Sequence, residues 1–192
     1  MTRAEFILNN LRGDNILDIG CAGHKGLVHQ RIRSSGKYVI GLDIAYKEIL
    51  KLSRLGGDYT TADAEYLPFK NESFDTVVLG EVIEHLSCPT RLLEECYRVL
   101  KSDGSLCITT PNVYSIDRIL SYMVTGKDTI GTPDHKVLYT PAVLISLLDR
   151  IGFRVAYYTT VRKFTFRGRF ITWKLPVFKH LGGNLCVVAQ KK

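Results

Sequence analysis

The sequence predicts an α/β fold with a doubly wound, mostly parallel sheet of seven strands and helices on both faces. Residues 15–33 read as a buried apolar strand, a turn with three glycines and an amphipathic helix, which is how open α/β sheets build a ligand site. Apolar strand segments then alternate with helical patterns over most of the chain. This alternation is typical of βαβ units in a parallel sheet.

The predicted elements follow one another in a regular order. Residues 2–12 form a short amphipathic helix that ends at Gly13. After the first strand, turn and helix, residues 37–43 predict a second, almost wholly apolar strand that ends in Asp43. The later elements are predicted at residues 46–55 (helix), 59–63 (strand), 76–80 (strand), 90–101 (helix), 105–110 (strand), 115–124 (helix), 141–150 (helix), 153–161 (strand) and 184–189 (strand).

Length and composition place the chain among ordinary globular proteins. The 192 residues fit one domain, residues 1–192, and 45% hydrophobic with 23% charged residues is enough for a packed core. No apolar run approaches the roughly 20 residues of a membrane span, and no signal peptide is recognisable. The five cysteines form no C-x-x-C pair, which favours reduced thiols in a cytoplasmic protein over disulfides or a zinc site.

The glycine turn indicates the kind of ligand. Its spacing is Gly20-x-x-Gly23-x-x-Gly26, not the G-x-G-x-x-G of dinucleotide sites. Asp18 is poorly placed beside a pyrophosphate but well placed for a cationic group, such as the amino acid end of S-adenosylmethionine (SAM). Asp43 lies 23 residues after Gly20, where doubly wound folds bind ribose hydroxyls. The alternatives are a tight turn without a ligand and an Asp43 that only caps the next helix.

Several motifs together carry a family resemblance. In chain order they are Asp18 with Gly20, Asp43, Asp63-Ala64, Leu67-Pro68-Phe69, Ser73-Phe74-Asp75 and Glu81-Val82-Ile83-Glu84-His85-Leu86. Over about residues 10–155 the series resembles the class I SAM-dependent methyltransferases, in particular the small-domain type 11 group. The resemblance implies a Rossmann-like fold in which the last strand runs antiparallel between the fifth and the sixth.

The resemblance also implies a cofactor site. The cofactor-binding residues that it indicates are Asp18, Gly20, Ala22, Gly23, Asp43, Ile44, Asp63, Ala64 and Gly80. By this resemblance, Asp18 and the glycine turn face the methionine half of SAM. Asp43 binds the ribose, and Asp63 with Ala64 contacts the adenine edge. Gly80 lets the backbone approach the cofactor. The chain departs from the family pattern at Ala22 and His24, which replace the second and third glycines of the usual turn.

Two carboxylates and two imidazoles are predicted beside the reactive methyl group. Glu81, Glu84 and His85 have the i, i+3 and i+4 spacing of one helical face, and His135 lies in a loop expected to close over them. We expect His85 or His135 to act as a general base for a substrate hydroxyl.

A divalent metal held by Glu81, Glu84, His85 and His135 is the alternative for this cluster. The pattern resembles small-RNA 3′-terminal 2′-O-methyltransferases and ubiquinone-pathway O-methyltransferases, in which such residues bind a metal. Other type 11 members carry the same residues without a metal. A site without metal is therefore the preferred interpretation.

A basic aromatic insert is predicted at about residues 162–183, before the last strand. Residues 150–192 hold ten Lys or Arg and no Asp or Glu, whereas the whole chain has a net charge of +7. The insert suits aromatic packing on the sheet, a substrate lid, a nucleic-acid surface or contact with an anionic membrane. The charge asymmetry alone does not choose between these.

The sequence therefore predicts transfer of a methyl group from SAM to a small or medium acceptor, with oxygen as the expected acceptor atom and S-adenosylhomocysteine as the product. RNA 2′-O-methylation with metal assistance is the first alternative, motivated by the cluster and the basic insert. A SAM-binding protein without catalysis is the second. The missing G-x-G-x-x-G disfavours a nicotinamide dehydrogenase.

Overall fold

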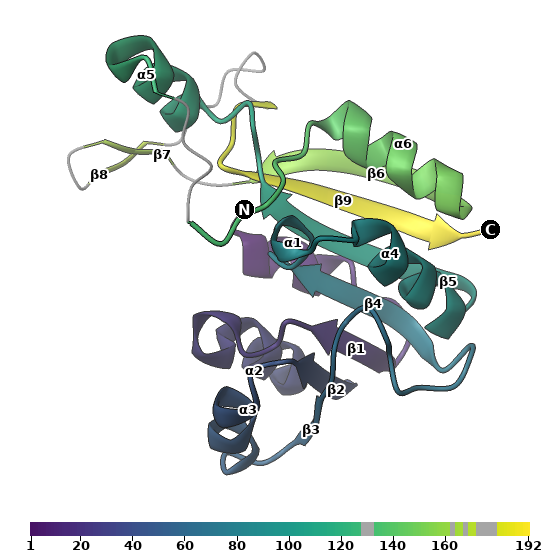
Figure 1. Cartoon of the computed structure of the whole chain (residues 1–192). Helices are drawn as coiled ribbons and strands as arrows, with labels where there is room; N and C mark the ends of the chain where they lie inside the picture. Colours follow the sequence, from purple (N-terminus) through teal and green to yellow (C-terminus); the bar gives the residue numbers. More distant parts are fainter. Residues whose placement is uncertain (128–132, 162–163, 167–168, 172–179) are drawn as a thin grey trace.

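A computed structural model describes residues 1–127, 133–161, 164–166, 169–171 and 180–192, without the side chains of His24 and of residues 164–166 and 169–171 (Figure 1). The strands of the main sheet are β1 (Asn15–Ile19), β2 (Tyr38–Asp43), β3 (Asp58–Thr61), β4 (Phe74–Gly80), β5 (Leu100–Pro111), β6 (Phe153–Val161) and β9 (Asn184–Lys191). The helices are α1 (Arg3–Asn9), α2 (Leu27–Ser34), α3 (Tyr46–Ser53), α4 (Pro89–Val99), α5 (Ile116–Thr125) and α6 (Pro141–Ile151), with the short 3₁₀ helices η1 (Gly23–Gly26) and η2 (Ile83–His85).

The seven-stranded sheet has the order β3-β2-β1-β4-β5-β9-β6 (Figure 1). β9 runs antiparallel to β5 and β6, and the other neighbours are parallel. The predicted fold class is therefore confirmed, including the position of the last strand. Because β2 and β4 lie on opposite sides of β1, the chain changes direction across the sheet at β1 and β4. Ligands of open α/β sheets bind at such a switch point.

Each face of the sheet has its own apolar core, since successive strand residues point to opposite sides. On one face Leu17 packs with residues of α4 and α6, of which Leu93 and Leu148 are fully buried. On the other face Ile16 packs with Phe6 of α1 and with Ile32 of α2. Burial of this kind contributes roughly 25 cal/mol for each Å² of apolar surface removed from water. The helices therefore hold the strand ends, and with them the site, in place.

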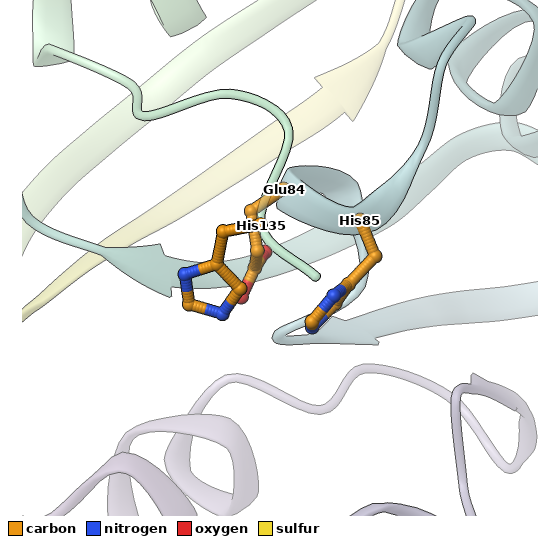
Figure 2. Close-up of side chains that lie close together, drawn as sticks. All are labelled: Glu84, His85 and His135. Atoms are coloured by element: carbon orange, nitrogen blue, oxygen red, sulfur yellow. The ribbon is translucent and has the colours of Figure 1, made fainter. Parts of the chain in front are cut away.

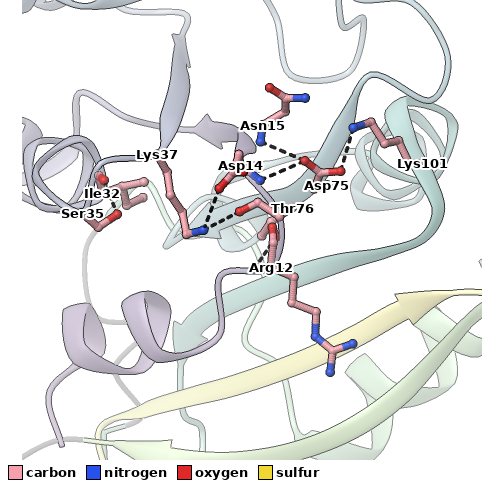
Figure 3. A network of polar contacts seen from close by, with 10 residues as sticks. Arg12, Asp14, Asn15, Ile32, Ser35, Lys37, Asp75, Thr76 and Lys101 are labelled. Atoms are coloured by element: carbon pink, nitrogen blue, oxygen red, sulfur yellow. Dashed lines mark hydrogen bonds and ion pairs between the residues drawn. The ribbon is translucent and has the colours of Figure 1, made fainter.

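Asp75 ties β4 to the beginning of β1 (Figure 3). One carboxylate oxygen accepts hydrogen bonds from the backbone N–H groups of Asp14 and Asn15 at 3.0 and 2.9 Å, and the other accepts one from Lys101 Nζ at 2.7 Å. A Cβ on Gly13, whose φ is +61°, would lie 2.3 Å from the Cβ of Asp75. The acid of the Ser73-Phe74-Asp75 motif thus has a structural role, far from the carboxyl ends of the strands.

Arg98 of α4 fixes the loop between β3 and β4. Its guanidinium donates to the carbonyl oxygens of Leu67 and Phe69 at 3.0 and 2.7 Å. Glu95 pairs with Arg98 at 2.7 Å and also accepts a hydrogen bond from the backbone N–H of Leu67 at 2.7 Å. The Leu67-Pro68-Phe69 motif is therefore held against α4.

The segment beyond β6 is described only in part. β7 (Phe164–Phe166) and β8 (Arg169–Ile171) form a separate antiparallel hairpin. Residues 162–163, 167–168 and 172–179 of the predicted basic insert lie outside the described residues, so its expected roles stay predictions. Among the described residues no helix is long and apolar enough to cross a membrane. All five cysteines are free thiols, and burial raises the pKa of Cys21, Cys96, Cys107 and Cys186.

Candidate active site

A cavity of about 380 Å³ opens at the carboxyl ends of β1, β2 and β4, at the switch point of the sheet. The residues that line it are Ile19, Gly20, Gly23, Leu42, Asp43, Ile44, Ala62, Asp63, Ala64, Gly80, Glu81, Val82, His85 and Leu86. Seven of the nine predicted cofactor residues are in this set. The two that are not, Asp18 and Ala22, lie next to it in the first strand and the turn.

Two glycines, Gly20 and Gly80, line the cavity at positions where the absence of a side chain matters. Gly20 has a φ of +76°, and a Cβ there would lie 2.3 Å from Cγ2 of Val82, so the turn cannot accept a side chain without rearrangement. A Cβ on Gly80 would meet no protein atom within 4 Å, and the space above it belongs to the cavity. Ala22 is not among the non-glycine residues with positive φ, so its replacement of a glycine causes no backbone strain.

Asp43 holds both the glycine turn and the beginning of α3. Its Oδ2 accepts a hydrogen bond from the backbone N–H of Ala22 at 3.0 Å, and its Oδ1 accepts one from Ala45 at 2.9 Å. The capping alternative and the cavity position therefore occur together. A carboxylate offers about four lone-pair sites, so two remain for hydroxyl groups of a ligand in the cavity.

Asp18 is buried instead of facing the cavity. Only 3% of its surface is exposed, and its Oδ2 lies 3.1 Å from Nδ1 of His29 on α2. Burial raises the pKa of Asp18, and the hydrogen bond from His29 lowers it in part. Asp63 is exposed at the rim of the cavity, where its Oδ1 accepts a hydrogen bond from the backbone N–H of Glu65 at 2.9 Å.

Arg3 and Asn184 hold the carboxylate of Glu81, a residue of the cavity wall, although no motif indicated them. Arg3 of α1 pairs with Oε2 of Glu81 at 2.6 Å, and Nδ2 of Asn184 donates to Oε1 of the same carboxylate. Glu81 has a φ of +62°, a conformation that is uncommon for a residue other than glycine. These partners come from the first helix and the last strand, so sequence spacing gives no signal for them.

The expectation that Glu81, Glu84 and His85 share one helical face was wrong. Glu81 precedes η2 with a left-handed backbone, and only Ile83–His85 forms a short 3₁₀ turn. As a result Glu84 is fully buried, His85 lines the cavity, and Glu81 points to Arg3. The physical reason is that Glu81 ends the strand with a left-handed backbone, and Leu86 returns to an extended backbone, so helical structure is confined to Ile83–His85.

Glu84, His85 and His135 come together beside the cavity (Figure 2). The ring centroids of the two histidines are 4.7 Å apart, and one ligand atom from each of the three residues lies within 4.8 Å of the others. The loop with His135 is fixed because the backbone N–H groups of Lys136 and Val137 donate to the carbonyl oxygen of Glu84 at 2.8 and 3.3 Å.

The carboxylate of Glu84 is incompletely satisfied. Its Oε2 accepts a hydrogen bond from Oγ1 of Thr110 at 3.0 Å, whereas Oε1 is buried without a hydrogen-bond partner among the described residues. Burial raises the pKa of this carboxyl, and the hydrogen bond from Thr110 acts in the opposite direction. Of the four metal-ligand candidates, the structure thus brings together three and separates Glu81 from them.

The chain is thus an α/β protein with a cavity at the switch point of its sheet. Proteins of this class bind nucleotide-type cofactors at that place. A family model described as "Methyltransferase domain" matches residues 17–108. A ubiquinone biosynthesis O-methyltransferase of Aliivibrio fischeri is 30% identical over 77% of this chain and 68% of its own length. The mitochondrial enzyme of that name from Bos taurus is 32% identical over 76% of this chain, but the match spans only 42% of its length.

Solved structures agree on the fold. A SAM-dependent methyltransferase from Archaeoglobus fulgidus superposes with a TM-score of 0.77 at 22% identity, over 98% of this chain and 91% of that one. The chain belongs to the family of SAM-dependent methyltransferases. Its cofactor is SAM, and the reaction is methyl transfer from the sulfonium centre.

Proposed function

We propose that this methyltransferase acts on a hydroxyl oxygen of a small-molecule acceptor, with His85 and His135 at the place where the acceptor's proton leaves. The observation that carries the proposal is that His85 lines the cofactor cavity with its ring 4.7 Å from that of His135. An imidazole takes a proton near neutral pH. The relatives are named as O-methyltransferases of ubiquinone biosynthesis, which supports an oxygen acceptor in a small molecule.

The residues that line the cavity support a placement of the cofactor in the arrangement expected from the sequence. The open space above Gly80 suits close approach of the ligand to the backbone. Asp43, which is followed by Ile44 in the cavity wall, is proposed to bind the ribose hydroxyls with its remaining lone pairs. Asp63 and Ala64 are proposed to lie beside the adenine. Gly20 and Gly23 face the methionine half.

The chain's main contribution to the reaction is orientation. SAM supplies an activated methyl group when bound, so the residues must hold the acceptor oxygen in line with it and exclude water. Arg3 is proposed as a further site residue, since its guanidinium lies against Glu81 at the cavity wall and interacts electrostatically with Asp18. A positive group there suits the carboxylate at the methionine end of the cofactor.

A panel of acceptors tests the proposal. Purified protein is incubated with SAM and catechols, phenols, amines or thiols, and release of S-adenosylhomocysteine is measured. We expect turnover with hydroxyl acceptors, and a loss of kcat of about 100-fold in His85→Gln because the general base is gone. His180→Gln, at an exposed histidine outside the cavity, is the matched control. Turnover with amines alone, or full activity of His85→Gln, contradicts the proposal.

A metal-assisted form of the same reaction is the second candidate. It is favoured by Oε1 of Glu84, which has no hydrogen-bond partner in the described part of the chain and lies beside His85 and His135. A carboxylate with two imidazoles is a mixed O and N donor set. The same assay with EDTA, MgCl₂ or MnCl₂ separates the two candidates. Activity that persists in EDTA supports a general base that acts without a metal ion. RNA 2′-O-methylation is not favoured by the named relatives, and most of the basic insert lies outside the described residues.

A further inference from the structure

His29 is a fully buried histidine that the cofactor cavity does not include. It lies on α2, its exposed fraction is 0%, and its Nδ1 is 3.1 Å from Oδ2 of Asp18. Asp18 itself is 3% exposed and lies directly before Ile19 and Gly20, which do line the cavity. The pair therefore sits immediately beneath the floor of the cofactor site.

The surroundings are shaped to hold the imidazole. The ring of His29 packs on that of Tyr59 with centroids 4.8 Å apart. A Cβ on Gly41 would lie 2.9 Å from Cε1 of His29 and 2.7 Å from Sγ of Cys21, so the strand beside the ring has no room for a side chain. Nε2 is buried with no hydrogen-bond partner among the described residues. Among the described residues, the ring thus makes its hydrogen bond through Nδ1, to Asp18.

Asp18 needs that contact. An isolated buried carboxylate is strongly disfavoured and takes up a proton unless donors satisfy it. Burial is the largest influence on the pKa of Asp18 and raises it, while the hydrogen bond and the charge of His29 lower it. The titratable or charged groups that interact with Asp18 are Arg3 of α1, Cys21 of the turn, His29 of α2, Asp43 of β2, Tyr59 of β3 and Cys107 of β5.

We propose that His29 is a positioning residue of the cofactor site: its Nδ1–H donates to Asp18, orients this carboxylate beneath the glycine turn and stabilises its ionised form. There the negative charge offsets the ammonium group at the methionine end of the cofactor. The inference rests on the proposed placement of the cofactor in the cavity. It does not depend on which acceptor is methylated.

Two amide substitutions separate a specific donor from general packing. The side-chain nitrogen of asparagine reaches the position of Nδ1, whereas that of glutamine reaches the position of Nε2. Binding of S-adenosylhomocysteine, which carries the same ammonium group, is measured by calorimetry. We expect His29→Asn to bind within about threefold of the wild type and His29→Gln about tenfold more weakly, which corresponds to about 1.4 kcal/mol.

The pH profile gives a second readout that a structural role would not move. In His29→Gln the hydrogen bond and the charge of His29, which lower the pKa of Asp18, are lost. The carboxyl group of Asp18 then ionises only at higher pH. Affinity in this variant should therefore rise with pH through a pH range above that of the wild type. His29→Asn should move the profile back toward that of the wild type, because it restores the hydrogen bond. Asp18→Asn should bind weakly at every pH. Thermal unfolding confirms that each variant is folded.

Equal affinities and equal pH profiles for wild type, His29→Asn and His29→Gln would overturn the inference. A wild type that does not bind S-adenosylhomocysteine would instead overturn the placement of the cofactor. The acceptor panel is independent of both results. The failure of this inference is thus distinguishable from the failure of the proposed function.

Discussion

Asp75 shows how a residue of the family pattern can act on stability and not on chemistry. It lies at the end of the sheet opposite the cavity and accepts hydrogen bonds from Asp14, Asn15 and Lys101 (Figure 3). Burial acts to raise its pKa, but these three donors outweigh burial, so the pKa is lowered. A carboxylate with a lowered pKa stabilises the fold where it is ionised.

Asp75→Asn should therefore destabilise the protein by about 1–2 kcal/mol at neutral pH, because one charged partner of Lys101 is lost. The folded-state pKa lies below the unfolded value of about 3.9. The stabilisation is thus present above that value and is lost as the pH falls through the folded pKa. Urea unfolding at about pH 7 and at about pH 3 measures the difference. A gap between wild type and variant that does not shrink in acid contradicts this account.

Individual residues were predictable from sequence where local chemistry determines them. Gly20 was predicted from the turn, Asp43 from its place at the end of a strand, and Gly80 from the close approach of the backbone to the cofactor. All three line the cavity. Arg3 and Asn184 were not predictable, because their contacts with Glu81 span 78 and 103 residues of sequence. Asp18 was expected to face the cofactor. The pairing with His29 that buries it depends on the packing of α2 and has no sequence motif.

At the scale of elements, the loop between β3 and β4 depends on α4. Arg98 and Glu95 bind the backbone of Leu67 and Phe69, only a few residues after Asp63 and Ala64 in the cavity wall. α4 is itself buried against the sheet through its apolar face. The loop thus acquires a fixed position from a helix that does not touch the cavity.

Arg98→Ala should lower the affinity for S-adenosylhomocysteine by about fivefold, because freeing the loop adds an ordering cost of roughly 1 kcal/mol to binding. Arg150→Ala, which removes an exposed arginine of α6, is the matched control and should bind as the wild type does. Calorimetry measures both variants. An Arg98→Ala protein that stays folded and binds with unchanged affinity would show that the loop is held by other contacts.

Elements differ in how well their sequence patterns predicted them. Most strands and long helices were found within a few residues of their expected ends, since apolar periodicity over many residues is a strong signal. β5 is an exception, because it begins at Leu100, whereas the sequence predicted a helix to residue 101 and a strand only from residue 105. The segment at Glu81–His85 was too short for a period to be read, because Glu81 has a left-handed backbone and only Ile83–His85 forms a 3₁₀ turn. η2 also explains why Glu84 reaches Thr110 below the cavity.

At the scale of the whole molecule, the sheet order determines where the cavity lies. The strand ends that carry Gly20, Asp43 and Gly80 are adjacent because β1 lies between β2 and β4. The first helix and the last strand meet over the same edge through Arg3 and Asn184. Sequence reasoning placed the cavity correctly since parallel strands bring their carboxyl ends together. The acceptor side depends on residues far apart in the chain, and much of the basic insert lies outside the described residues.

The most direct test of the account is calorimetric titration of the wild type and Asp43→Ala with S-adenosylhomocysteine. With SAM placed in this cavity, we expect a wild-type Kd of about 10 μM or lower, and a loss of affinity of at least about tenfold in Asp43→Ala, or about 1.4 kcal/mol. Asp149→Ala, at an exposed acid of α6, should bind as the wild type does. No binding by the wild type, or equal binding by Asp43→Ala, would contradict the placement of SAM in this cavity.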